Sequence, residues 1–136
     1  MKIIYLILLS FLFFSCDKSE IKLYYAEGYI VGFDPCTIRH HYDIGYVIFT
    51  SDLKDTLVTY NLPSTLYNFT DNFFNNYVNS SFFPDSIRYK FRVKISYTKA
   101  TGNQIVVHEC SSDFNNCDFG IQIIYNQVII KSASKY

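Results

Sequence analysis

Alternating apolar and polar residues run through most of this chain. The clearest stretch covers residues 89–98, where every second residue is large and apolar and the residues between are polar. A period of two residues is typical of a β-strand with one face buried and the other exposed. The same pattern, over shorter or less regular stretches, predicts further strands at 24–33, 45–50, 56–61, 104–109 and 120–131, the last with a bend near Asn126.

One segment has the spacing of a helix instead. Its apolar residues are three or four positions apart, and Ser64 or Thr65 is expected to cap its start. The polar residues of the segment are rich in asparagine, which forms helix poorly, so this helix should depend on packing against a sheet. The apolar positions are Leu66, Phe69, Phe73, Phe74, Tyr77 and Val78.

The order of these segments indicates the fold. Three strands are followed by a helix and then by two or three strands. This is the order found in small OB-like barrels, in which the helix lies between the third and fourth strands. We therefore expect a mainly β domain, a five- to six-stranded antiparallel OB-like barrel, with a β-sandwich as the alternative.

The start of the chain has a different pattern. Met1 and Lys2 precede a run of apolar residues that ends at Phe14, and Ser15 follows. As a helix this run would span roughly 18 Å, well short of the ~30 Å hydrocarbon core of a membrane. One positive charge, a short apolar run and a small residue together are typical of a secretory signal peptide.

Cys16 comes directly after Ser15. The tetrapeptide Phe13-Phe14-Ser15-Cys16 resembles the lipobox of bacterial lipoproteins, although Phe13 replaces the usual leucine, as in aromatic lipoboxes of Bacteroidota. The resemblance implies that Cys16 is lipidated, becomes the new N-terminus, and holds the protein to a membrane through acyl chains such as palmitate. The alternative is that the apolar run is a buried first strand and Cys16 a packing residue.

This resemblance divides the chain into a signal peptide (1–15), a short tether (16–21) and a domain (22–136). The remaining length suits one domain. The polar residues 17–20 are loosely similar to the export signal of surface lipoproteins of Bacteroidota. We expect a location in the cell envelope at the outer membrane, on either its surface or its periplasmic face.

Further segments of the domain resemble a group of small Bacteroidota lipoproteins. The similar segments are 28–36, 45–48, Asn61-Leu62-Pro63, the strand from Tyr89, and a late cysteine. The resemblance implies the same fold and location, and it implies no activity.

Charge limits the partners. Twelve basic and twelve acidic residues balance, and the isoelectric point is about 6.8. Proteins that follow nucleic-acid phosphates carry a clear excess of basic residues, so no nucleic-acid partner is expected.

Motifs of catalysis are also missing from the sequence. There is no Gly-x-Ser-x-Gly elbow and no glycine-rich phosphate loop. Asp34, Asp43, Asp52 and Asp71 fall at turns or at the predicted helix start, where carboxylates commonly cap backbone N–H groups. We expect a non-enzymatic binding module, without a cofactor, whose partner is an envelope protein or a glycan.

Three cysteines remain when Cys16 is assigned to lipid: Cys36, Cys110 and Cys117. An oxidising envelope allows one disulfide and leaves one thiol over. A bridge from Cys36 to Cys117 or Cys110 would stabilise the fold by roughly 4 to 5 kcal/mol, against about 2 to 3 kcal/mol for a local Cys110–Cys117 bridge. The resemblance also favours a bridge from Cys36 to a late cysteine.

The same cysteines allow a second interpretation, a metal-binding or redox protein. Thiolate and imidazole are ligands for zinc and copper, and His40, His41 and His108 are the histidines of the chain. No Cys-x-x-Cys pair or His-Glu-x-x-His helix supports this interpretation. We therefore assign no metal ligands.

A binding surface is predicted by analogy with the fold. In OB-like barrels the loop between the first two strands and the face of strands two and three make the usual contacts. Here these regions carry Tyr42, Tyr46 and Tyr60, together with Arg39. Tyrosine suits such a surface because it combines an apolar ring with a polar tip, although these rings could instead fill a core that has no tryptophan.

Two tripeptides suggest modification. Asp55-Thr56-Leu57 and Asp85-Ser86-Ile87 resemble the O-glycosylation signal of Bacteroidota. Thr56 and Ser86 would carry the glycan. The alternative is that both aspartates simply cap turns.

Overall fold

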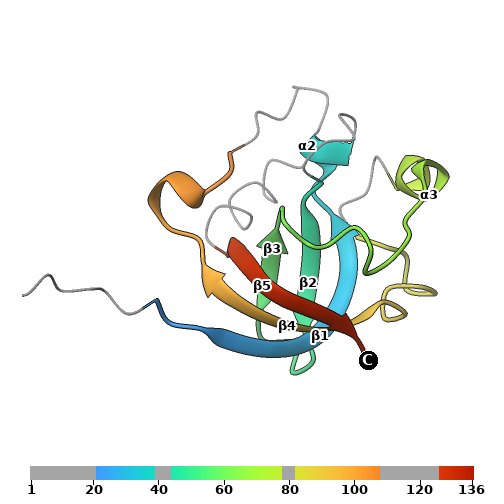
Figure 1. Cartoon of the computed structure of the whole chain (residues 1–136). Helices are drawn as coiled ribbons and strands as arrows, with labels where there is room; N and C mark the ends of the chain where they lie inside the picture. Colours follow the sequence, from blue (N-terminus) through green and yellow to red (C-terminus); the bar gives the residue numbers. More distant parts are fainter. Residues whose placement is uncertain (1–20, 39–43, 78–81, 108–125) are drawn as a thin grey trace, which may run out of the picture.

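Five strands and a few short helical turns make up the described part of the chain (Figure 1). The computed structural model describes residues 21–38, 44–77, 82–107 and 126–136. Its elements are β1 (Tyr24–Phe33), α2 (Pro35–Ile38), β2 (Tyr46–Thr50), β3 (Thr56–Thr59), α3 (Asp71–Asn76), β4 (Arg92–Lys99), the 3-10 turn η2 (Gly102–Gln104) and β5 (Val128–Lys135).

The strands form one curled antiparallel sheet in the order β3-β2-β1-β4-β5. Its curvature in Figure 1 gives the outline of a half-barrel, and α3 lies between β3 and β4 in the chain. The prediction of a mainly β, OB-like arrangement is confirmed. A single sheet over the described residues does not fit the sandwich alternative, which needs two packed sheets.

The two edge strands of the sheet approach each other. The Val58 amide in β3 donates to the carbonyl of Asn126 just before β5, at 3.0 Å, and Val58 forms a parallel bridge with Gln127. The side-chain amide of Asn61 continues this seam, because it donates to the Ile130 carbonyl (3.0 Å) and accepts from the Ile130 amide (2.9 Å). One asparagine side chain thus takes the place of a strand residue.

β1 is the strand around which the sheet bends. It pairs with β2 along one side and β4 along the other, and a β-bulge at Val31 shifts its register to β2. At Gly28 the neighbouring strand comes so close that a Cβ atom would meet the carbonyl oxygen of Phe49. Only glycine allows this close approach without moving the backbone.

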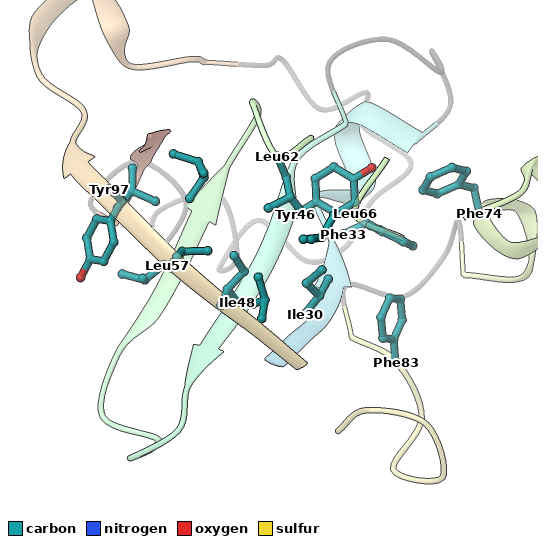
Figure 2. Packing of buried hydrophobic residues seen from close by; sticks show 14 residues of the cluster. Ile30, Phe33, Tyr46, Ile48, Leu57, Leu62, Leu66, Phe74, Phe83 and Tyr97 are labelled. Atoms are coloured by element: carbon teal, nitrogen blue, oxygen red, sulfur yellow. The ribbon is translucent and has the colours of Figure 1, made fainter. Parts of the chain in front are cut away.

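Aliphatic side chains and aromatic rings together fill the core inside the curled sheet (Figure 2). Phe33, at the end of β1, contacts Phe74 of α3 and Phe83 with ring centroids 4.8 and 5.0 Å apart. α3 therefore joins the barrel through aromatic packing. The buried cluster consists of Ile30, Phe33, Tyr46, Ile48, Leu57, Leu62, Leu66, Phe74, Phe83, Val93, Ile95, Tyr97, Val128 and Ile130.

The predicted start of the helix is wrong. α3 begins at Asp71, after Thr70, whose Oγ1 accepts from the Phe73 amide at 3.3 Å. Leu66 and Phe69 do pack on the core, but from turns, because the Leu66 amide bonds back to the carbonyl of Pro63. The predicted helix was too long because apolar residues before α3 and within α3 reach the same core, and their combined spacing resembles that of one helix.

Two predicted strands also need correction. Residues 85–89 form turns, so β4 begins at Arg92 instead of Tyr89. Within 104–109 the described residues form no strand: Gln104 ends η2, and Val106 pairs in both directions with the side-chain amide of Gln127, at 2.7 and 2.6 Å. Because a side chain supplies these hydrogen bonds, the described residues 104–107 pair with no neighbouring strand through their backbone.

The other strand predictions agree with the structure. β1 has the predicted bounds, and β2 and β3 lie within theirs. β5 overlaps the predicted 120–131 but continues to Lys135, and residues 120–125 lie outside the described part. α2, a single helical turn after Asp34, falls where the sequence predicts only a turn.

Candidate functional site

The predicted tyrosine surface does not form as expected. Tyr46 is 9% exposed and packs in the core, with its ring 5.6 Å from Phe33. Tyr60 is half-buried, and its hydroxyl donates to Oδ2 of Asp34 at 2.8 Å. Tyr42 and Arg39 lie outside the described residues. The prediction is wrong for Tyr46, because strand alternation places it on the inner face together with Ile48. For the half-buried Tyr60, a surface role stays a prediction.

The outer face of β2 and β3 is partly buried. Val47 and Val58 alternate with core residues along these strands, yet they are fully buried. Phe49 and Thr56, paired on the same face, are half-buried. Among the described residues this face therefore offers little exposed surface, and the hollows elsewhere on the barrel are described next.

A buried carboxylate fixes the connection from β1 to β2. Asp34 is almost fully buried and accepts from the Cys36 amide (2.9 Å) as well as from Tyr60. Burial, and then the charge of Asp34, raises the pKa of the Tyr60 hydroxyl well above its ordinary value. Gly45 completes the arrangement, because a Cβ there would lie 2.7 Å from Asp34. Asp34 serves the turn, as its sequence position predicts.

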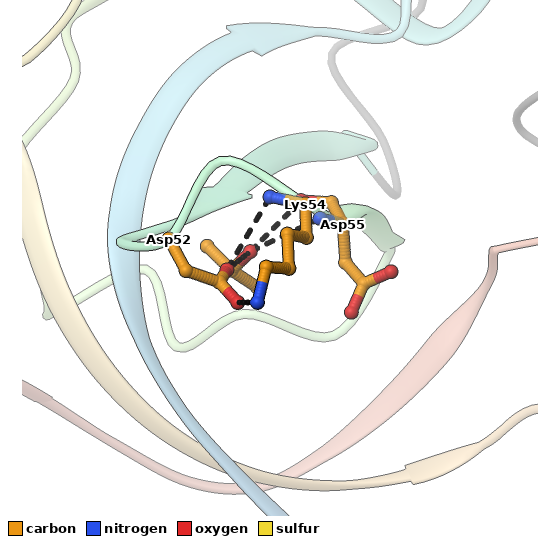
Figure 3. A network of polar contacts seen from close by, with 4 residues as sticks. Asp52, Lys54 and Asp55 are labelled. Carbon is orange, nitrogen blue, oxygen red and sulfur yellow. Dashed lines mark hydrogen bonds and ion pairs between the residues drawn. The ribbon is translucent and has the colours of Figure 1, made fainter.

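The second acidic turn joins β2 to β3 (Figure 3). Oδ1 of Asp52 accepts from the Thr50 hydroxyl at 2.6 Å, and Oδ2 lies 3.7 Å from Nζ of Lys54. The hydrogen bond from Thr50 is the main reason that the pKa of Asp52 is lowered. Asp71 lies in the first turn of α3. Asp52 thus takes the local role expected of it, since it also accepts from the Lys54 amide, whereas the residue that caps α3 is Thr70.

An open hollow lies on the outer face of β1, β4 and β5. We call it the β1–β4–β5 groove, and its volume is about 380 Å³. Tyr25 stands at its edge, 76% exposed, on the side of β1 opposite to the core-facing Tyr24. The groove is lined by Tyr25, Ala26, Glu27, Lys94, Ile95, Ser96, Ser132 and Ser134.

Polar groups surround the ring of Tyr25 in this groove. Glu27 and Lys94 face each other across β1 and β4, with Oε1 and Nζ 2.7 Å apart. The hydrogen bond to Glu27 is the main cause of a raised pKa at Lys94. The hydroxyls of Ser96 and Ser132 are 2.7 Å apart. The groove therefore presents one carboxylate, one ammonium group and several hydroxyls.

A second hollow adjoins the first. It measures about 300 Å³ and shares Tyr25, Ala26 and Glu27 with the β1–β4–β5 groove. On its far side it is lined by the β2–β3 turn, including Asp52 and Asp55. Tyr25 thus lines both hollows, and each of them is also lined by at least one carboxylate.

Sequence reasoning missed Tyr25 for a definite reason. The run Tyr24-Tyr25-Ala26-Glu27 offers two tyrosines in adjacent positions, and the pattern alone does not say which one points outward. The usable signal is Glu27, since the residue two positions from an outward carboxylate shares its face.

The remaining predicted residues divide between the described and undescribed parts. Cys36 lies in α2, whereas Cys16, Cys110 and Cys117 and the three histidines lie outside the described residues. Thr56 opens β3 and is half-buried, and Ser86 lies in an exposed turn.

Two features are absent from the described residues, a metal-binding cluster and a membrane-spanning helix. No group of three or more His, Cys, Asp or Glu side chains is placed to hold a metal ion there. Likewise, no helix in that part of the chain has the length and apolar character to cross a bilayer.

The β1–β4–β5 groove is therefore the candidate site. Its carboxylate and ammonium groups form an ion pair, and the hydroxyls of Ser96 and Ser132 are within hydrogen-bond distance of each other. Comparisons of this chain with protein-family models, with curated protein sequences and with solved structures found no match.

Proposed function

We propose that this chain is a lipid-anchored lipoprotein of the outer membrane whose OB-like domain is a non-enzymatic binding module for a neutral oligosaccharide. The anchor is Cys16, on the strength of the lipobox resemblance at residues 13–16. One disulfide from Cys36 to a late cysteine stabilises the domain. The β1–β4–β5 groove is the binding site.

The observation that carries the binding proposal is the position of Tyr25. A single exposed aromatic ring is ordinary on a protein surface. A ring that is 76% exposed and lines two hollows is less so. Its flat apolar face can pack against the C–H face of a sugar ring at small entropic cost, because tyrosine has few rotatable bonds.

The polar groups around Tyr25 favour a sugar over a polyanion. Hydroxyls such as those of Ser132 and Ser134 can both donate and accept hydrogen bonds, as sugar hydroxyls do. Glu27 and Asp52 border the two hollows and would repel phosphate groups. Lys94 is already paired with Glu27, so it adds little attraction for an anion.

The test is binding by the full chain purified in detergent. An array of neutral oligosaccharides selects a ligand, and calorimetry then compares wild type with Tyr25→Ala and Tyr89→Ala. Tyr89 is a matched control, because it is also exposed (46%) but lines neither hollow. We expect Tyr25→Ala to weaken binding about tenfold or more, which corresponds to about 1.4 kcal/mol, and Tyr89→Ala to bind as wild type does.

Two results would contradict the proposal. One is an array on which no neutral oligosaccharide binds the wild-type chain above background. The other is equal affinity of wild type and Tyr25→Ala for the selected ligand.

A further inference from the structure

A second surface of the domain has a different chemical character. A hollow of about 460 Å³ lies at the start of β1, and its lining includes Lys22, Lys99 and Lys131 but no carboxylate. The whole chain has equal numbers of acidic and basic residues, so three lysines without a lining acid form a local excess of positive charge. We call these three lysines, with Ile21 and Leu23, the anchor-side surface.

The aromatic ring of Tyr24 holds two of these lysines. Nζ of Lys22 lies 5.1 Å from the ring centroid and Nζ of Lys99 lies 5.8 Å from it. Such cation–π contacts keep the ammonium groups near the ring without neutralising their charge. Elsewhere the lysines at 54 and 94 lie within 4 Å of carboxylates. The charge of the anchor-side surface is therefore available to an anion.

Apolar side chains accompany this charge. Ile21 is 79% exposed and Leu23 is 43% exposed, on either side of Lys22 in the chain. Lysines beside exposed aliphatic side chains are the combination that lies at the headgroup level of an anionic membrane. A free phosphate ion would use the lysines but would leave both aliphatic side chains in water.

The distance to the proposed anchor is short. Ile21 is five residues after Cys16, so even a fully extended tether reaches only about 17 Å. Figure 1 shows that the start of β1 and η2 lie on the same side of the molecule, away from α3 and the C-terminus. The surface nearest to the lipid is therefore the basic one.

We infer that the anchor-side surface rests on the membrane, with Lys22, Lys99 and Lys131 contacting the phosphates of anionic lipid headgroups and with Ile21 and Leu23 in the interface. This inference rests on the proposed lipidation of Cys16. The acyl chains hold the domain at the bilayer, and the basic surface gives it one orientation.

Lysine footprinting of the full lipidated chain tests the orientation. The chain is reconstituted into vesicles of phosphatidylcholine, either alone or with about 30 mol % phosphatidylglycerol to supply negative surface charge. A short pulse of an acetylating reagent is then read by mass spectrometry. We expect Lys22, Lys99 and Lys131 to be acetylated at least about threefold more slowly in the anionic vesicles, since buried ammonium groups react slowly.

Exposed lysines elsewhere serve as internal controls. Lys54, Lys90 and Lys135 are exposed and outside the anchor-side surface, and their rates should be equal in the two kinds of vesicle. Amide hydrogen exchange gives a second measurement, in which anionic vesicles should slow the exchange of residues 21–24 in the wild-type chain. The triple variant Lys22→Gln, Lys99→Gln, Lys131→Gln should lose this protection. The variant with Gln at the three control lysines should keep it.

Two outcomes would overturn the inference, and one control reports the anchor separately. Equal acetylation of all lysines in both kinds of vesicle overturns the inference. Slower acetylation in detergent micelles on adding inorganic phosphate alone assigns the lysines to a free anion and also overturns it. The mass of the N-terminal peptide in the same samples reports lipidation of Cys16, so failure of the anchor is recognised independently of failure of the orientation.

Discussion

Asp34 is a buried carboxylate that accepts a hydrogen bond from the hydroxyl of Tyr60. This contact accounts for the half-buried position of Tyr60. Oδ2 of Asp34 accepts from the Tyr60 hydroxyl, and Oδ1 accepts from the Cys36 amide. Replacing Tyr60 by Phe removes one hydrogen bond to a buried charge. We expect the free energy of unfolding to fall by about 1 to 3 kcal/mol, measured by urea denaturation at pH 7.

Alkaline pH gives a second measurement on Tyr60. Its pKa in the folded chain is raised above the ordinary value near 10 by burial and by Asp34, so the folded state favours the neutral hydroxyl. This contribution is complete below about pH 10 and is lost as the pH rises above that, because the unfolded chain releases its proton first.

We therefore expect the unfolding free energy of the wild-type chain to decline above pH 10, and that of Tyr60→Phe to decline less steeply. Tyr46 and Tyr97 also have raised pKa values, so some decline remains in the variant. An equal slope in wild type and variant would remove Tyr60 from the explanation.

Cys36 carries the prediction of a disulfide. Linked to Cys110 or Cys117 it would close a long loop, and in the chain-entropy model this stabilises the fold by about 4 kcal/mol. Digestion under non-reducing conditions followed by mass spectrometry should find Cys36 joined to one of the two. The prediction fails if Cys36, Cys110 and Cys117 are all recovered as free thiols.

Exposed side chains were harder to predict than buried ones. The alternation in 89–98 correctly placed Phe91, Val93, Ile95 and Tyr97 toward the core. In 24–33 and 45–50 the sequence did not show that Tyr46 faces inward and Tyr25 outward, because tyrosine is compatible with both environments. The candidate site therefore came from the structure.

At the scale of elements, the seam between β3 and β5 depends on side chains. Asn61→Ala would remove both hydrogen bonds to the backbone of Ile130, which is buried. We expect a loss of about 1 to 3 kcal/mol in unfolding free energy. The exposed Asn68 provides the control, since Asn68→Ala should change stability by less than about 0.5 kcal/mol. Equal effects of the two changes would mean that Asn61 does not hold the seam.

The two predicted O-glycosylation sites lie in different elements. Thr56 is paired within β3, opposite Phe49, whereas Ser86 lies in an exposed turn where Asp85 is paired with Arg88 at 2.9 Å. A transferase needs an accessible hydroxyl, and turns provide one more readily than strands do. We expect glycopeptide mass spectrometry of the native protein to find Ser86 modified in preference to Thr56. A glycan on Thr56 alone would reverse this expectation.

The positions of β1, β2 and β3 were predicted well because a strand with one buried face has apolar residues at every second position of the sequence. The start of the helix was not, since Leu66 and Phe69 reach the core from turns. Segment 104–107 also misled the prediction, because the side chain of Gln127 replaces a partner strand. Long-range contacts of this kind leave no local pattern.

At the scale of the whole molecule, two surfaces of different chemical character lie on one small barrel. The β1–β4–β5 groove offers an exposed ring, hydroxyls and a paired carboxylate. The anchor-side surface offers unneutralised lysines beside aliphatic side chains. In the proposed lipid-anchored binding module, the anchor-side surface would contact the membrane and the groove would bind the ligand.

Lipidation of Cys16 is the central claim, since the location and the orientation both depend on it. Cells that express the full chain are grown with an alkyne fatty acid, and the protein is isolated and coupled to a fluorophore. We predict label on wild type and on the control variant Cys36→Ala, and none on Cys16→Ala, because only Cys16 stands directly after the proposed signal peptide. Equal labelling of Cys16→Ala and wild type would contradict the account.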